Sequence, residues 1–159
     1  MMKTHHILLL AATVALSACA GKPPTTTPVP STLVRLPMTP VAIGCAYHEG
    51  TSYIYSFYVQ EPYSQLMLGG TSCGGINAAG YILPIQWQPG MKVKVRWKPN
   101  ARDWIEKTTT IRRYDEAGDL FVHFFANDEV RVVSSARYSP QSPMHPIPKS
   151  VTIAPPEEE

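Results

Sequence analysis

The chain has 159 residues, of which 44% are hydrophobic and 16% charged, and its formal net charge is +2. A net charge so close to zero implies no particular class of partner, and the length leaves room for one modest hydrophobic core. The charges are unevenly distributed, because residues 92–113 carry eight of the fourteen basic side chains, whereas residues 115–129 carry five acidic side chains and no lysine or arginine.

The first eighteen residues have the pattern of a signal peptide. Lys3 precedes an apolar run from Ile7 to Leu16, which ends in Leu-Ser-Ala-Cys at 16–19. The run is about ten residues long, whereas a helix needs about twenty to cross a membrane, so a transmembrane helix is the poorer interpretation. The motif resembles the lipobox of bacterial lipoproteins, in which the cysteine is acylated and becomes the new N-terminus; an ordinary secretory cleavage is the alternative. We therefore expect Cys19 to carry a lipid anchor.

The anchor implies a location. By resemblance to sorted lipoproteins, Ala20 rather than Asp after the cysteine favours the outer membrane, with the protein facing the periplasm. An exported lipoprotein does not ordinarily meet nucleic acid, so we expect none as a partner.

Two proline-rich segments flank the rest of the chain. Residues 20–40 and 139–159 contain twelve of the sixteen prolines and lack the apolar periodicity of a core. We expect residues 19–40 to form an extended tether and residues 139–159, which end in Pro-Pro-Glu-Glu-Glu, to form a disordered tail. A single domain then remains at residues 41–138.

Seven segments of this domain are rich in β-branched and aromatic residues and are separated by turn sequences, which is typical of β-strands. They are residues 41–47, 52–59, 80–86, 91–98, 104–112, 119–125 and 129–135. Asn127-Asp128 indicates a tight hairpin, since both residues tolerate a positive φ, and Pro62 allows a minor helical turn at 61–68. The sequence therefore predicts an all-β fold of about seven antiparallel strands in a sandwich or open barrel.

The segment 91–98, Met-Lys-Val-Lys-Val-Arg-Trp-Lys, alternates strictly between basic and apolar residues. With the period of two of a half-buried strand, its valines and tryptophan face the core, and four cations face solvent or a partner. The four are Lys92, Lys94, Arg96 and Lys98. An acidic protein, anionic lipid or lipopolysaccharide phosphate are the candidate partners. Alternatively, the cations bind no partner molecule and form ion pairs across strands with Glu106, Asp128 or Glu129.

No motif for a catalytic, metal, cofactor or phosphate-binding site appears in the chain, and we expect no cofactor and no enzymatic activity. Cys45 and Cys73 are predicted to form a structural disulfide in the oxidising periplasm. A nucleophile pair of Cys73 with His48 and a metal site of Cys45, Cys73 and His48 are the alternatives. His123 shares a strand face with two phenylalanines, which favours a packing role, whereas His48 lies in an expected turn and is a candidate contact residue. The glycine-rich stretch 68–80 around Cys73 favours an irregular or bulged connection.

The motifs together resemble a family of small proteobacterial lipoproteins known as domain of unknown function 3304. The resemblance covers residues 41 to about 138. The resemblance rests on the sequences AYHEGTSYIYSFYV at 46–59, GGTSC at 69–73, PIQWQPGMKVKVRW at 84–97, Trp104, and LFVHFFANDEVRVVSS at 120–135. The chain departs from the family at Tyr47, where Asn is usual, and at Gly74, where a second cysteine is frequent.

Some members of that family resemble immunity lipoproteins, which bind lipase toxins of type VI secretion systems in the periplasm. The resemblance therefore implies a protein-binding module with no catalytic groups, whose partner is a secreted phospholipase toxin. We expect the four cations at 92–98 to bind it together with Tyr53, Tyr55, Trp104 and His48. The alternative function is an envelope structural lipoprotein, or one that binds lipid phosphate or glycan. An enzyme that uses Cys73 and His48 is a third hypothesis.

Overall fold

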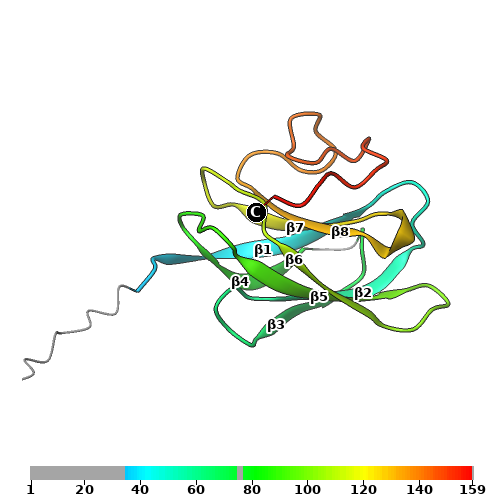
Figure 1. Ribbon diagram of the computed structural model, residues 1–159, viewed down its shortest axis with the longest axis horizontal. Helices are drawn as coiled ribbons and strands as arrows, with labels where there is room; N and C mark the ends of the chain where they lie inside the picture. The colour runs from blue at the N-terminus through cyan, green and yellow to red at the C-terminus, as the bar shows by residue number, and fades with distance from the viewer. Residues whose placement is uncertain (1–34, 75–76, 159) are drawn as a thin grey trace, which may run out of the picture. The chain divides into compact units, whose positions relative to one another are not determined.

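The computed structural model describes residues 35–74 and 77–158 and consists of eight β-strands in two sheets (Figure 1). The strands are β1 (Met38–Tyr47), β2 (Ile54–Gln60), β3 (Met67–Thr71), β4 (Ala78–Pro84), β5 (Lys92–Pro99), β6 (Ile105–Thr110), β7 (Asp119–Phe124) and β8 (Val130–Ser135). The order β4-β1-β7-β8 forms one sheet, here called the β1 sheet, and β3-β2-β5-β6 forms the other, the β5 sheet. The two pack as a sandwich, so the predicted all-β fold is confirmed, with one strand more than expected.

The strands are antiparallel except for one pair at the centre of the β1 sheet. There β1 and β7 run parallel, with Ile43 opposite Leu120 and Tyr47 opposite Phe124. Five strands lie between β1 and β7 in the chain, so no short hairpin forces them into antiparallel order. The wholly antiparallel arrangement that we expected is therefore wrong at this pair.

Aromatic side chains from both sheets fill the space between them. Trp97 of β5 and Phe57 of β2 approach Phe124 of β7 from the other sheet, at ring-centroid distances of 5.5 Å and 5.8 Å. All three side chains are at most 2% exposed. This cluster joins the sheets and places β5 with one side in the core and the other side outward.

The strand that sequence analysis missed is β3. The chain turns at residues 61–66 and then pairs with β2 from Met67, so the predicted helical turn at 61–68 is wrong. Gly69 explains the irregular course: its φ is +138°, and a Cβ there would lie 2.3 Å from the carbonyl oxygen of Phe57. Only glycine allows this close approach, at a point where the register with β2 shifts between Phe57 and Tyr58.

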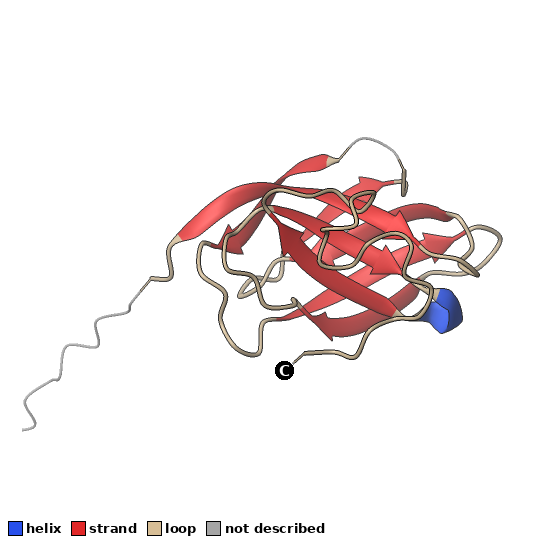
Figure 2. Cartoon of the chain, turned by 90° about the horizontal axis from the view of Figure 1, so that it is seen from above, coloured by secondary structure: helices blue, strands red, loops and turns tan. Residues whose placement is uncertain are grey.

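The C-terminal segment is ordered, contrary to the predicted disordered tail. Residues 139–158, here called the C-terminal strap, run across the outer face of the β1 sheet (Figures 1 and 2). Ile147 is 1% exposed and packs with Phe121, Phe125 and Val133. These residues make the outer side of β7 and β8 apolar, so the sheet needs a cover, which composition alone does not reveal. The domain thus extends beyond residues 41–138, from the start of β1 to the strap.

The predicted hairpin at Asn127-Asp128 is confirmed as a tight connection between β7 and β8. Both residues have a φ of +59°, within the 3-10 turn η1 (Ala126–Asp128). No helix in residues 35–74 or 77–158 is long and apolar enough to span a membrane. Cys19, the expected signal peptide and most of the tether lie outside the described residues.

Candidate functional site

The cation row, defined as Lys92, Lys94, Arg96 and Lys98, lies on the outer side of β5. The intervening Val93, Val95 and Trp97 are 1%, 0% and 2% exposed, whereas the four cations are exposed or half-buried. The alternation predicted from the sequence is therefore confirmed. Because β5 lies inside its sheet, between β2 and β6, the row has neighbours on both sides.

Arg96 is the centre of an aromatic contact. Its guanidinium carbon lies 4.8 Å from the ring centroid of Trp104, just before β6, and Trp104 lies 6.0 Å from Tyr58 of β2. Trp104 is still 40% exposed. A cation–π pair at an exposed site contributes about 0.5–1 kcal/mol. Residues from β2, β5 and the segment just before β6 thus contact one another while Trp104 stays partly exposed.

The other cations have polar neighbours within the β5 sheet. The ammonium of Lys94 lies 3.1 Å from the carboxylate of Glu106 on β6, and Lys98 donates to the carbonyl oxygen of Arg102 at 3.1 Å. Lys94 and Glu106 are 44% and 48% exposed, so their pair is worth at most a few tenths of a kcal/mol. The cross-strand partner Glu106 is thus confirmed for one lysine, and Lys92 has no ion pair among the described residues.

Tyr53 and Tyr55, at the start of β2, form a second aromatic group. They are 44% and 67% exposed, and their rings meet edge to face at 6.4 Å. The amide of Asn100 donates to the carbonyl oxygen of Tyr53 at 2.8 Å, so the tyrosines lie next to the turn that follows Lys98. Their described ring contacts are with each other and with Tyr47, not with Trp104.

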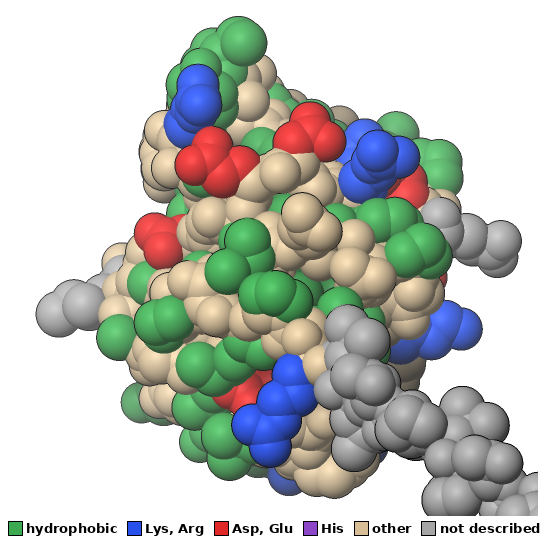
Figure 3. All heavy atoms as spheres, turned by 90° about the vertical axis from the view of Figure 1, so that its left-hand side faces the viewer, with side chains coloured by type: hydrophobic (Ala, Val, Ile, Leu, Met, Phe, Trp, Pro, Cys, Tyr) green, Lys and Arg blue, Asp and Glu red, His purple; other side chains and the backbone are tan. Residues whose placement is uncertain are grey.

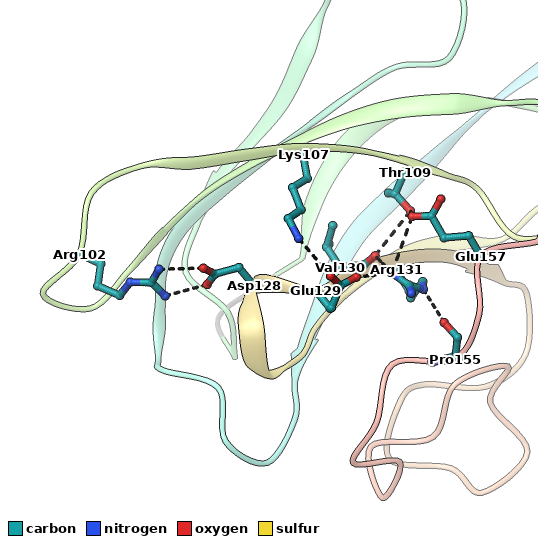
Figure 4. A network of polar contacts seen from close by, with 9 residues as sticks. All are labelled: Arg102, Lys107, Thr109, Asp128, Glu129, Val130, Arg131, Pro155 and Glu157. Carbon is teal, nitrogen blue, oxygen red and sulfur yellow. Dashed lines mark hydrogen bonds and ion pairs between the residues drawn. The ribbon is translucent and has the colours of Figure 1, made fainter.

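Most of the other basic residues of this region are neutralised in a network at the edge where β6 approaches β8 (Figure 4). Arg102 binds Asp128 with two hydrogen bonds of 2.7 Å and 2.8 Å, and Lys107 binds Glu129 at 3.1 Å. These bonds lower the pKa of both carboxyl groups below their ordinary values, Asp128 through Arg102 and Glu129 first through Lys107. Asp128 and Glu129 therefore pair with basic residues at this edge, and the cation row is left largely without ion pairs.

The acidic end of the strap joins the same network. Glu157 accepts a hydrogen bond from the hydroxyl of Thr109 at 2.9 Å and lies 3.7 Å from Arg131, while Glu158 pairs with Arg112 at 2.6 Å. The guanidinium of Arg131 also donates to the carbonyl oxygen of Pro155. Glu157 and Glu158 thus make structural contacts with the β-sandwich.

Cys45 and Cys73 form a disulfide with a Cα–Cα distance of 5.5 Å, which joins the β1 sheet to the loop after β3. The predicted pairing is confirmed. A sulfur in a disulfide can neither attack a substrate nor bind a metal as a thiolate, so the Cys73–His48 nucleophile and the metal site of both cysteines with His48 are wrong. Within residues 35–74 and 77–158, no group of three or more His, Cys, Asp or Glu side chains is arranged to hold a metal ion.

His48 is buried, contrary to its predicted role as an exposed contact. It is 3% exposed and stacks on Phe125 at 4.0 Å between ring centroids. The expectation for His123 is met, since it is fully buried. The ring of His123 contacts that of His145 in the strap, and His48 contacts His123 and the backbone of Val151, so the three histidines are here called the histidine cluster.

Hydrogen bonds define the tautomer of neutral His48. A carbonyl oxygen can only accept, so Nδ1–H of His48 donates to Val151. Nδ1 of His145 lies 2.8 Å from the carbonyl oxygen and 3.1 Å from the amide nitrogen of Ile147, so it donates to the first or accepts from the second, according to its tautomer. Nε2 of His48 then accepts from Nδ1–H of His123 at 2.9 Å. The remaining Nε2 atoms of His123 and His145 are buried and have no hydrogen-bond partner. With neutral imidazoles, the form that burial favours, Nε2 of His123 is an enclosed nitrogen without a proton.

Burial lowers the pKa of all three imidazoles. The decrease is largest for His123, whose pKa lies well below the ordinary value because of burial and then because of His145 and His48. For His48 and His145 burial is again the main cause, partly offset by the hydrogen bonds to backbone carbonyls.

A cleft of about 410 Å³ lies beside the disulfide, between β1, β7 and the start of the strap. Its walls combine charged and polar side chains, among them Asn77, Asp119, Arg137 and Tyr138, with the ring of Phe121.

Figure 3 shows one end of the molecule, where hydrophobic side chains gather in the middle and acidic and basic side chains lie scattered around them. That face carries no patch of a single charge sign.

Comparison with known proteins adds a family but no activity. A family model described as "Protein of unknown function (DUF3304)" matches residues 47–132. The matched stretch contains the cation row, both aromatic groups, Cys73, His48 and His123, whereas Cys45 and the strap lie outside it. Neither the curated proteins nor the solved structures contain a match.

Proposed function

Because the chain belongs to the DUF3304 family, which is defined without an activity, we propose from its surface that it is a protein-binding module. The binding surface consists of the cation row, Trp104 with Tyr58, and the exposed pair Tyr53 and Tyr55. The partner presents an acidic surface to this face.

The contact of Arg96 with Trp104 is the observation that carries the proposal. Arginine, tryptophan and tyrosine are the residue types that contribute most binding energy at protein interfaces, because they bury a large area at a small cost in side-chain entropy. Here Arg96, Trp104 and Tyr58 are held by neighbouring strands before any partner arrives, which lowers the ordering cost of binding. Partly unpaired cations around them raise the association rate with an acidic partner.

The test is a pull-down with tagged protein in which the cation row is reversed to glutamate. We expect the native protein to retain one stoichiometric partner and the reversed variant to lose it, because each cation faces solvent without a structural ion pair except at Lys94. The single variants Arg96→Ala and Trp104→Ala should each weaken affinity about tenfold or more if they are central to the interface. Binding that weakens as salt is raised would support the electrostatic contribution.

A charge-matched control separates this face from net charge. Arg35, Arg113, Arg137 and Lys149 are all exposed and lie outside β5, so reversing these four changes the net charge by the same amount. The control variant should keep the partner. Equal loss in both variants, or unchanged affinity on reversal of the cation row, would contradict the proposed face.

The finer proposal is an immunity role for a lipid-anchored protein of the outer membrane. It is supported by the lipobox-like sequence ending at Cys19 and by a rigid β scaffold suited to blocking a toxin. Cells with the native chain should survive a secreted phospholipase toxin that kills cells with the reversed cation row. Cys19→Ala should abolish palmitate incorporation and release the protein from membranes, and retained labelling would exclude Cys19 as the anchor.

The second candidate is binding of lipid phosphate or glycan, which the mixed polar and aromatic walls of the cleft favour. In that case the protein should bind vesicles of anionic lipid in a salt-sensitive manner, or soluble glycan fragments, with no protein partner recovered. Arg137→Ala in the cleft, rather than reversal of the cation row, should then reduce binding.

A further inference from the structure

The histidine cluster connects the C-terminal strap to the β1 sheet. His48 follows β1, His123 belongs to β7 and His145 belongs to the strap. The ring centroids of His48 and His123 are 5.2 Å apart, and those of His123 and His145 are 5.1 Å apart. His48 also donates to the carbonyl oxygen of Val151 in the strap. The strap therefore covers the imidazoles of His48 and His123, supplies the third imidazole itself, and accepts a hydrogen bond from His48.

The imidazolium forms of His123 and His145 would each carry an Nε2–H that has no acceptor while the strap is closed. The free nitrogens are Nε2 of His123 and Nε2 of His145, and both are enclosed without an acceptor. A proton on either would create a buried N–H without a partner and a positive charge without water, both of which are unfavourable.

The groups around the cluster do not offset such a charge. Lys149 of the strap lies near His48, and on β8 Arg131 is opposite His123 in register, where it is already bound to Glu129 and Glu157. The β1 neighbour of His123 is Ala46. Among the described residues no carboxylate hydrogen-bonds to any of the three imidazoles.

We propose that the histidine cluster is a pH-sensitive latch: at mildly acidic pH it takes up protons, the C-terminal strap detaches, and the apolar outer face of the β1 sheet becomes accessible. The strap is the element that yields because it contains no strand and is held by turn hydrogen bonds, by Ile147 and Val151, and by the pairs of Glu157 and Glu158. The sandwich beneath keeps its strand ladders and its disulfide. Local opening therefore hydrates the imidazolium groups without loss of the core.

The direction of the effect follows from linkage. In the open state the imidazoles titrate near their ordinary value of about 6.5, whereas in the closed state they resist protonation, so the open state binds more protons. The closed state has its full stability above about pH 7. As pH falls below about 6.5, the equilibrium constant for closing decreases by up to tenfold per pH unit for each histidine that is protonated only on opening.

Hydrogen exchange on the full chain tests the latch, with rates corrected for the intrinsic effect of pH. Between about pH 7.5 and about pH 5 we expect protection of strap amides such as those of Ile147, Lys149 and Val151 to fall at least tenfold, and protection of β5 amides to stay constant. In His123→Phe, which replaces the fully buried imidazole by a ring that cannot titrate, most of the fall should disappear. His145→Phe serves the same purpose if His123→Phe does not fold.

The double variant Glu157→Gln with Glu158→Gln is the matched control. It should lower strap protection at both pH values and leave the ratio between them unchanged. Constant strap protection in the native chain, a simultaneous loss in β5, or a full pH response in both histidine variants would each overturn the latch.

Discussion

Trp97→Ala is expected to lower the free energy of unfolding by about 3–5 kcal/mol, the range for removing a large aromatic side chain from a packed core. Trp97 is 2% exposed and meets Phe124 of the opposite sheet at 5.5 Å. Its loss leaves a cavity where the two sheets join, and the disulfide and strand ladders prevent the sheets from closing over it. Urea denaturation followed by circular dichroism measures the change as a shift in midpoint.

Trp104→Ala is the matched control, because it removes the same side chain from a position that is 40% exposed. It should cost about 1 kcal/mol or less, chiefly through its contact with Arg96. If the two variants were equally destabilised, the assignment of Trp97 to the core and of Trp104 to the surface would be wrong.

Replacing both cysteines of the disulfide, as Cys45→Ala with Cys73→Ala, is expected to lower stability by about 3–4 kcal/mol. The bridge closes a loop with a sequence separation of 28, and the cross-link restricts the unfolded chain accordingly. The closed loop includes all of β2 and β3. Thermal and urea unfolding of the double variant should show the loss.

Reductant provides the complementary measurement. It should destabilise the native protein by a similar amount and leave the double variant unchanged. Cys19→Ala should not affect unfolding of the domain, since it removes a cysteine outside the bridge. A double variant as stable as the native protein would mean that the bridge does not restrict the unfolded state.

The cation row was predictable because it depends on local alternation. Successive side chains of a β-strand point to opposite sides of the sheet. The sequence of residues 91–98 alone therefore places its cations outward and its valines inward. The partners of those cations were only partly predictable. Glu106 pairs with Lys94 as expected, but the stacking of Arg96 on Trp104 depends on the register of β5 with β6.

The histidine cluster could not be predicted by local reasoning. His48 and His123 are 75 residues apart and meet because β1 and β7 pair in parallel. His145 joins them from a proline-rich segment whose composition is typical of a disordered tail. The one available signal was the run of aromatic residues around His123, which left an apolar face that needed a cover.

The sequence by itself determined the all-β class, the outward side of β5, the hairpin at Asn127-Asp128 and the pairing of Cys45 with Cys73. Each depends on short-range periodicity, on the φ angles that a residue tolerates, or on the presence of two cysteines in the domain. Only the tertiary structure decided the parallel β1–β7 pair, the extra strand at Gly69, the burial of His48 and the order of the C-terminal strap. These features arise from contacts between distant segments, where the free energy of covering an apolar sheet face exceeds the local preference of a proline-rich chain for disorder.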